Sequence, residues 1–253
     1  ASYGRIAESN TAIIEMSAAA GITLVNESDR NPLHTTTYGV GELIRDALKK
    51  GCRKFIIGIG GSATTEGGIG MLSALGYDFM DENGDRLSPV FDSLEKVVQI
   101  KNNRVPEVLK DCHFQIACDV TNPLCGARGC VYVFGAQKGV KEEEKESMDR
   151  AMQSYAACLE KFTGKKLSEI PGTGAAGGLG FAFLWGLPNV ELKPGIDIVL
   201  EAVGLTNELK DADVVVTGEG CLDFQTAMGK VPVGVAKTAK NYNCKVIAFA
   251  GSV

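Results

Sequence analysis

The chain has 253 residues, of which 45% are hydrophobic and 23% charged, so it is long enough for one large globular domain or two ordinary ones. Its formal net charge of −5 and the lack of a long run of Lys or Arg argue against a nucleic-acid partner. No apolar run is long enough to cross a membrane, and the first residues, ASYGRIAESN, lack the features of a signal peptide. We therefore expect a cytoplasmic protein that has no membrane partner.

The eight cysteines are too sparse for a disulfide scaffold and form no C-x-x-C pair. Only His34 and His113 are available to complete a zinc site. The cysteine pattern therefore predicts reduced, unbridged thiols that do not bind metal.

Strand-like and helix-like segments alternate along the first part of the chain. The predicted order is a strand at 11–17, a helix at 39–51, a strand at 54–61 and a helix at 68–76. This alternation predicts an α/β fold.

The later segments continue the same pattern with more loops. We expect a hairpin at 77–87 about an Asn83-Gly84 turn, a strand at 114–124 that runs into a loop stopped by proline, and a long amphipathic helix at 141–164 ended by Gly164. A glycine-rich stretch at 171–183, a helix at 197–212, a buried strand at 213–220 and a final helix and strand within 234–253 follow.

The segment GIGGSATTEGG at 58–68 lies between a predicted strand and a predicted helix. Its glycines allow backbone amides to approach a ligand closely, and a helix start adds partial positive charge, so we expect this loop to bind an anion such as phosphate. The loop lacks the lysine of a Walker A motif. It does fit the looser dinucleotide pattern G-x-G-x-x-A, with Asp81 near the expected distance, although Asp81 lies in a polar turn and not at the end of a buried strand.

A second glycine-rich match, GTGAAG at 172–177, follows no predicted strand, which weakens it as a dinucleotide motif. Two interpretations stay open for it: contact with a ligand, or a tight turn that begins a closely packed helix of small residues.

Polar side chains follow two further apolar strands. ACDVTNPL places Asp119 and Asn122 after one strand, and VVVTGEGCLDFQTAMGK places Glu219, Asp223 and Lys230 after another. Carboxylates at such positions suit Mg²⁺ or proton abstraction, and a lysine suits phosphate charge, although Asp and Asn also cap turns. Together with the 58–68 loop, these clusters suggest a phosphoryl-transfer site.

Five segments in order resemble the bacterial type I glycerate kinases: NPLHTTTYGVGELIRDAL, IIGIGGSATTEGGIGMLSALG, ACDVTNPLCGARGCVYVFGAQKG, PGTGAAGGLG and VVTGEGCLDFQTAMGKVPVGVA. The resemblance covers nearly the whole chain. It implies transfer of the γ-phosphoryl group of ATP to a hydroxyl of D-glycerate with Mg²⁺, 2-phosphoglycerate being the favoured product. It also implies a two-domain α/β fold: a second α/β domain at 1–209 and part of an incomplete flavodoxin-like domain at 210–253.

The resemblance, together with the loop chemistry, assigns roles to particular residues. Asp119 is the expected substrate base or metal contact, and Lys230 is expected to stabilise the charge on the transferred phosphoryl group. Substrate or phosphate contacts are expected from Gly60, Gly61, Ser62, Thr64, Asn122, Glu219 and Asp223, and the Mg²⁺ candidates are Asp119, Glu219 and Asp223.

The chain also departs from the family pattern. Thr65-Glu66 stands where relatives usually carry Asn-Asp, Cys221 replaces a basic residue, and the family's N-terminal loops and its C-terminal part are missing. An inactive fragment or ligand-binding domain of such a kinase is therefore an alternative, and an NAD(P)-binding α/β enzyme is a more distant one. A homodimer is a further hypothesis.

Overall fold

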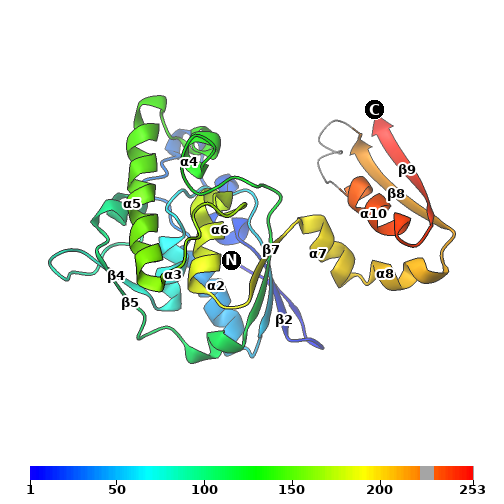
Figure 1. Cartoon of the computed structure of the whole chain (residues 1–253), viewed down its shortest axis with the longest axis horizontal. Helices are drawn as coiled ribbons and strands as arrows, with labels where there is room; N and C mark the ends of the chain where they lie inside the picture. The colour runs from blue at the N-terminus through cyan, green and yellow to red at the C-terminus, as the bar shows by residue number, and fades with distance from the viewer. Residues whose placement is uncertain (223–230, 253) are drawn as a thin grey trace. The chain divides into compact units, whose positions relative to one another are not determined.

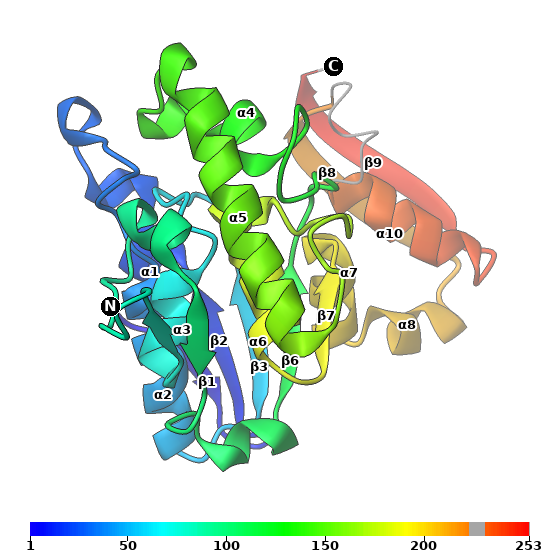
Figure 2. The same cartoon turned by 60° about the vertical axis from the view of Figure 1, so that its left-hand side comes forward.

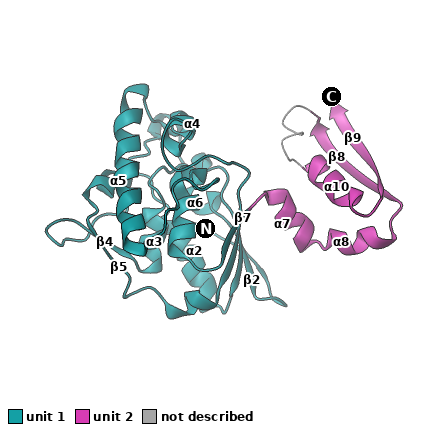
Figure 3. Cartoon of the chain, viewed as in Figure 1, with its two compact units in different colours: residues 1–192 teal, residues 193–253 magenta. Residues whose placement is uncertain are grey.

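The computed structural model describes residues 1–222 and 231–252. The chain divides into two compact units, residues 1–192 and residues 193–253 (Figure 3). The family-domain boundary that we expect after residue 209 stays a prediction, because a compact unit need not coincide with a family domain.

Unit 1 is built on a five-stranded sheet in the order β1-β2-β3-β6-β7 (Figure 2). The strands are β1 (Gly4–Ile6), β2 (Thr11–Glu15), β3 (Lys54–Gly58), β6 (His113–Ala117) and β7 (Val190–Lys193). β1 is antiparallel to β2, whereas β2, β3 and β6 are mutually parallel, with Glu15 opposite Gly58 and Gly58 opposite Ala117. The carboxyl ends of these three parallel strands therefore lie at one edge of the sheet.

One face of this sheet is buried under helices. Phe55 and Ile57 of β3 and Phe114 and Ile116 of β6 alternate with less buried neighbours, as expected for a sheet with one covered face. The rings of Phe55 and Phe114 stack 4.7 Å apart. Figures 1 and 2 show the covering helices on the same side of the sheet: α2 (Tyr38–Lys49), α3 (Ile69–Leu75), α5 (Lys145–Thr163) and α6 (Ala175–Gly186).

The two longest predicted helices of unit 1 are confirmed. α2 occupies most of the segment predicted at 39–51, and its apolar face contributes Val40, Ile44 and Ala47 to the core. α5 begins after a 3-10 turn, Glu142–Glu144, and ends at Gly164, whose φ of 72° supplies the left-handed C-cap that the sequence predicts.

The hairpin predicted about the Asn83-Gly84 turn is present in a short form. An antiparallel bridge joins Met80 to Arg86, and the Leu87 amide donates to the Phe79 carbonyl at 2.9 Å. β4 (Asp78–Met80) also pairs with β5 (Gln99–Lys101) in a regular antiparallel ladder, which the sequence does not predict. Also present are α1 (Ser17–Ala20), α4 (Cys130–Phe134) and 3-10 helices at Ile22–Leu24, Glu27–Asp29, Phe91–Lys96, Glu107–Asp111 and Ala136–Lys138.

Unit 2 contains a β-α-β unit in which β8 (Val214–Cys221) and β9 (Lys245–Ser252) are parallel and α10 (Val231–Lys240) lies between them in the chain. It is preceded by α7 (Gly195–Ala202), α8 (Leu205–Glu208) and a 3-10 turn, Leu209–Asp211. The helix predicted at 197–212 is thus interrupted, and the break lies at Gly204, which has a φ of 67°.

The strand predicted as buried at 213–220 is present but not buried. Val216 in β8 is 61% exposed and Phe249 in β9 is 66% exposed, and Val214 and Ile247 are also exposed. One buried cluster of this unit contains Leu209, Ala239 and Cys244, and Ile198, Leu200 and Val235 are also buried. An apolar sheet surface in this part of the chain is therefore open to solvent.

Two further observations concern the cysteines and the helices. All eight cysteines are free thiols. In the described ranges, 1–222 and 231–252, we find no helix with both the length and the apolar character needed to cross a membrane.

Candidate functional site

A cavity of about 330 Å³ lies in unit 1 where the chain leaves the carboxyl ends of β3 and β6. Gly60, Gly61 and Ser62 line it after β3, and Asp119 lines it after β6. Ligands of parallel α/β sheets gather at this edge, so the sequence brings these four predicted site residues together at an ordinary binding position.

The Gly60–Ser62 segment presents backbone amides that have no acceptor within the described part of the chain. Among the described residues, none accepts a hydrogen bond from the amides of Gly60, Gly61 or Ser62. The segment is nevertheless fixed on either side, because the Ile22 amide donates to the Gly61 carbonyl at 2.8 Å and the Ala63 amide donates to the Ala20 carbonyl at 2.9 Å. A fixed loop with free amides can bind an anion without first rearranging.

The two glycines of this loop have different requirements. Gly61 has a φ of 70°, in the left-handed region where a side chain is strained. Gly60 has no such φ, and a Cβ placed on it would meet no atom within 4 Å. The space beside Gly60 is therefore available to a ligand.

The second half of the 58–68 loop does not present its donors to a ligand. α3 begins at Ile69, and the Glu66 carboxylate accepts hydrogen bonds from the Gly68 amide at 2.9 Å and the Gly70 amide at 3.2 Å. Thr37 donates to the same carboxylate through its amide at 2.7 Å and its hydroxyl at 2.6 Å. The expectation that an external anion binds at this helix start is wrong, since the chain's own carboxylate occupies the position.

Burial raises the pKa of Glu66, whose side chain is fully inaccessible, while the donors from Thr37, Gly68 and Gly70 oppose this rise. Glu66 thus ties the loop to the start of α2 and the start of α3. The sequence marks Glu66 as a departure from the family pattern but does not reveal this function.

Thr64 and Asn122, both predicted ligand contacts, lie outside the residues that line the cavity. The Thr64 hydroxyl is buried and has no hydrogen-bond partner among the described residues. The Asn122 side chain donates to the Arg128 carbonyl at 2.8 Å, and the Asn122 carbonyl accepts from the amides of Gly172 and Gly174. Asn122 therefore holds two loops together, and ligand contact by either residue stays a prediction.

The glycine-rich start of α6 packs against the 58–68 loop. Ala176, Gly177 and Gly178 all have left-handed φ values, and the Gly67 amide donates to the Gly177 carbonyl at 2.9 Å. A Cβ on Gly177 would meet the Thr64 carbonyl oxygen. Close packing, one of the two interpretations left open, accounts for these glycines, while Ala175 and Ala176 also line the cavity.

Lys138 is a cavity residue that sequence reasoning missed. It is 2% exposed, and its Nζ donates to the Thr64 carbonyl at 2.6 Å. Burial lowers the pKa of Lys138 to about 8, against the opposing effects of Cys130 and Glu66. The signal in the sequence is slight: Lys138 stands in VFGAQKG directly before Gly139, which adopts a φ of 101°.

The predicted residues of the GEGCLDFQTAMGK segment lie in unit 2 or outside the described residues. Glu219 and Cys221 are within β8 and not on a loop, because the strand is longer than predicted. Asp223 and Lys230 fall outside the described residues, so their roles stay predictions.

The magnesium hypothesis has limited support from side chains in the described part of the chain. No group of three or more His, Cys, Asp or Glu residues that could hold a metal ion is found there. Mg²⁺ bound with a nucleotide, however, usually takes one or two carboxylates together with phosphate oxygens and water. Asp119 beside the free amides of the Gly60–Ser62 segment fits that requirement as a single protein ligand.

The dinucleotide-binding alternative requires Asp81 to bind a ribose, but the Asp81 carboxylate has another function in the structure. The Asp81 carboxylate accepts hydrogen bonds from the amides of Asn83 at 3.0 Å and Asp85 at 2.9 Å, which closes its own turn. Gly60 and Gly61 also stand well before α3, which begins only at Ile69. The Rossmann fingerprint requires its glycines at the helix start and a free acid for the ribose, so the pattern match is not supported.

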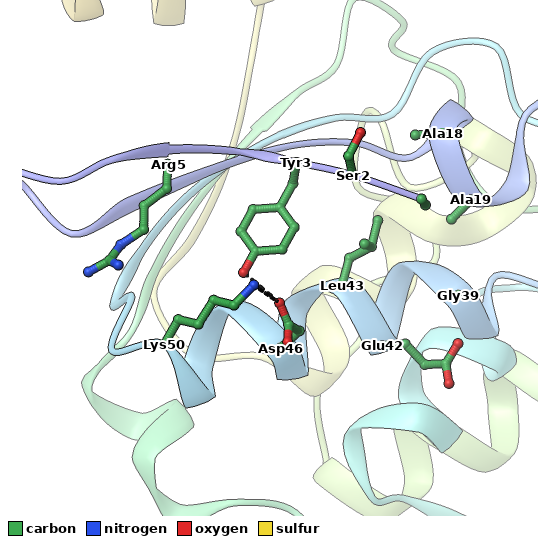
Figure 4. Close-up of a pocket in the computed structure, with 11 residues that line it drawn as sticks. Ser2, Tyr3, Arg5, Ala18, Ala19, Gly39, Glu42, Leu43, Asp46 and Lys50 are labelled. Carbon is green, nitrogen blue, oxygen red and sulfur yellow. Dashed lines mark hydrogen bonds and ion pairs between the residues drawn. The ribbon is translucent and has the colours of Figure 1, made fainter.

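A second hollow, of about 850 Å³, lies between the first residues and α2 and contains none of the predicted site residues (Figure 4). In it the Tyr3 hydroxyl donates to Asp46 at 2.7 Å, and Lys50 forms an ion pair with the same carboxylate at 2.7 Å. Tyr3, Asp46 and Lys50 therefore satisfy one another, which makes this hollow a weaker candidate than the cavity at Gly60–Ser62.

Comparisons with known proteins agree with the resemblance. The model of the glycerate kinase family matches residues 1–253. A glycerate kinase of Haemophilus influenzae is 48% identical over 249 residues, and a glycerate 2-kinase of Escherichia coli K12 is 45% identical over 253 residues. The alignments cover 98% and 100% of this chain, but the chain spans only 66% of the length of each relative.

A solved structure supports the fold. The protein from Salmonella typhimurium LT2 that carries the name glycerate kinase 2 superposes with a TM-score of 0.93 at 45% identity. The superposition covers 99% of this chain and 67% of that one. The expected two-domain α/β fold of this family is therefore confirmed at the level of the fold.

Proposed function

The chain belongs to the glycerate kinase family, and from this premise we propose that it carries the acceptor site of an ATP-dependent kinase that phosphorylates D-glycerate. The observation that supports this proposal is the cavity at the sheet edge, where the unused amides of Gly60, Gly61 and Ser62 stand with the Asp119 carboxylate. A volume of about 330 Å³ suits a small organic anion better than a whole nucleotide.

In the proposed reaction, a glycerate hydroxyl attacks the γ-phosphorus of ATP, the bond between that phosphorus and the β–γ bridging oxygen breaks, and ADP leaves. Asp119 accepts the hydroxyl proton or contacts Mg²⁺, and the Gly60–Ser62 amides bind an oxyanion of the substrate. A kinase contributes mainly by positioning its reactants and neutralising charge, which fixed amides can do. When bound, Mg²⁺ would neutralise phosphate charge, with Asp119 as its ligand in unit 1 and Glu219 and Asp223 as further candidates.

The remaining parts of the proposal follow from the family and from sequence. Lys230 stabilises charge on the transferred phosphoryl group, 2-phosphoglycerate is the favoured product, and the protein is cytoplasmic. The second candidate is the alternative that the sequence leaves open, a chain that binds its ligand without turnover. The chain spans 66% of the length of each of the two relatives.

Phosphorus NMR of a mixture of the protein, ATP, MgCl₂ and D-glycerate tests the proposal. We expect a new phosphomonoester signal split into a doublet by one proton, as at the 2-position, whereas a triplet would indicate the 3-position. Asp119→Asn should slow its appearance by roughly two or more powers of ten. Asp92→Asn, an exposed aspartate in a 3-10 helix, is the matched control and should leave the rate unchanged.

No phosphomonoester signal, with D-glycerate still bound, would contradict turnover and favour the domain that only binds. If the Asp119→Asn and Asp92→Asn variants form the phosphomonoester at equal rates, Asp119 has no part in the reaction.

A further inference from the structure

The buried ammonium group of Lys138 borders the cavity, and none of the roles described above involves it. Lys138 lines the same cavity as Gly60, Ser62 and Asp119, on the 3-10 helix Ala136–Lys138 that follows α4. At 2% exposure, its ammonium group is removed from water, and an ammonium group without strong partners is costly in such a place.

The partners of this ammonium group are incomplete. An ammonium group has three N–H donors, and the structure gives Nζ one acceptor among the described residues, the Thr64 carbonyl at 2.6 Å. The Glu66 carboxylate affects Lys138 electrostatically, but its oxygens already accept hydrogen bonds from Thr37, Gly68 and Gly70. The positive charge is therefore only partly compensated by the protein.

The bond to Thr64 also connects Lys138 to the proposed anion site. Thr64 follows Ser62 by two residues, on the loop whose amides lack acceptors. A donor on the Thr64 carbonyl fixes this loop, and the charge adds a favourable electrostatic contribution for any anion in the cavity. A neutral donor could fix the loop, but only a cation could provide the second effect.

We propose that Lys138 is the cation of this anion site, which holds the Gly60–Thr64 loop through the Thr64 carbonyl and increases the affinity of the cavity for a small oxyanion, either a carboxylate or a phosphate. The inference rests on the proposed function in one respect, namely that the Gly60–Ser62 amides bind an anion. It goes beyond that function by naming a positioning residue and the charge that selects the ligand.

The groups around Lys138 define how binding should depend on pH. Those that face it are Cys130 of α4 and Glu66, and Asp119 lines the same cavity. Burial raises the pKa of Cys130 to about 12, so this thiol stays neutral at pH 8.5. With its pKa lowered to about 8, Lys138 is mostly neutral at pH 8.5, and a bound anion that favours its charged form must draw a proton from solution.

Isothermal titration calorimetry of the chain at constant ionic strength tests this proposal. Sodium sulfate and sodium D-glycerate are the two probes, since neither titrates near pH 8.5, and they distinguish a phosphate-like site from a carboxylate site. Lys138→Met should weaken the preferred probe at pH 7 by roughly tenfold or more, and Lys138→Arg should retain most of the affinity. Lys165→Met, at an exposed lysine, is the matched control and should bind as the unsubstituted chain does.

Measuring proton uptake shows whether Lys138 acts through its positive charge or only by holding the loop in place. At pH 8.5, in two buffers of different ionisation enthalpy, the unsubstituted chain should take up roughly half a proton per bound anion. Lys138→Met should take up none. This measurement on the unsubstituted chain keeps the proposal testable even if Lys138→Met fails to fold.

Three results would overturn the inference. Binding by the unsubstituted chain without proton uptake would reject the role of Lys138 and leave the anion site in place. The same conclusion would follow if a folded Lys138→Met variant bound the probe as tightly as the unsubstituted chain. Failure of the unsubstituted chain to bind either probe would overturn both this inference and the anion site of the proposed function. Loss of kinase turnover with anion binding intact would count only against the proposed function.

Discussion

Gly60 and Gly61 are neighbours in the anion loop, yet substitution should have a different effect at each. Gly60→Val should keep the free energy of unfolding within about 0.5 kcal/mol, because the new Cβ meets no atom within 4 Å, and should weaken anion binding roughly tenfold or more by filling the ligand's space. Gly61→Val should instead cost about 1–3 kcal/mol of stability, since a β-branched residue is strained at a φ of 70°. Urea denaturation and sulfate titration measure the two effects.

Gly4→Val is the matched control for Gly60→Val. Gly4 lies in β1 away from the cavity, has no left-handed φ, and a Cβ there would make an ordinary contact of 3.7 Å with the Ile13 Cβ. If the Gly4→Val and Gly60→Val variants bind sulfate equally well, the bound anion does not occupy the space beside Gly60.

Lys138 should affect stability in a manner that depends on pH. The pKa of Lys138 is about 8 in the folded chain and 10.5 for an ordinary lysine, so between these pH values the unfolded chain binds a proton that the folded chain does not. Raising the pH through this window should therefore stabilise the unsubstituted chain relative to Lys138→Met, by on the order of 3 kcal/mol. Urea denaturation of both proteins at pH 7.5 and pH 10, under reducing conditions, measures this effect. If the two proteins differ in free energy of unfolding by the same amount at both pH values, Lys138 is not a buried, titrating ammonium group.

At the scale of single residues, sequence predicted the site only in part. Gly60, Gly61, Ser62 and Asp119 follow apolar strands, and parallel strands bring their carboxyl ends to one edge, so their meeting could be predicted. Lys138 could not be found in this way, because a buried lysine and an exposed one look alike in a sequence. The four hydrogen bonds of Glu66 depend on how Thr37 and α3 pack, which is tertiary information.

At the scale of elements, Gly177 at the start of α6 should be more sensitive to substitution than its backbone conformation alone implies. Gly177 and Gly164 have similar φ values, 67° and 72°, but a Cβ on Gly177 would lie 2.5 Å from the Thr65 Cα, whereas a Cβ on Gly164 would meet no atom within 4 Å. Gly164→Ala should cost about 1 kcal/mol, and Gly177→Ala roughly 3 kcal/mol or more. Urea denaturation measures both, and equal costs would contradict the close packing of the α6 segment on the 58–68 loop.

Sequence predicted the regular elements better than the local exceptions. α2 and α5 have clear apolar faces, and the parallel strands have apolar runs, so periodicity identified them. The 77–87 hairpin is present, but its pairing of β4 with the distant β5 was not predicted. The anion-binding helix start was wrong, because Glu66 accepts hydrogen bonds from the amides at the start of α3. Both differences arise from contacts that no local pattern contains.

At the scale of the whole molecule, the two units should differ in their ability to fold alone. Unit 1 has an extensive buried core, whereas the core of unit 2 contains Leu209, Ala239 and Cys244, and its Val216 and Phe249 are exposed. We expect residues 1–192 to unfold cooperatively at a urea concentration close to that of the longer chain. Residues 193–253 alone should show no cooperative transition and should bind an apolar dye. A folded, dye-free 193–253 segment would contradict this account.

Above all, we propose that the Gly60–Ser62 amides of this glycerate kinase family member form an anion site with Asp119. The most direct measurement is a titration of the ¹⁵N-labelled chain with D-glycerate, in which the amide NMR signals are followed residue by residue. We predict that the Gly60, Gly61 and Ser62 signals shift together and saturably, while the signal of Gly4 stays in place. Saturable shifts confined to other loops, with the Gly60–Ser62 signals unmoved, would contradict the claim.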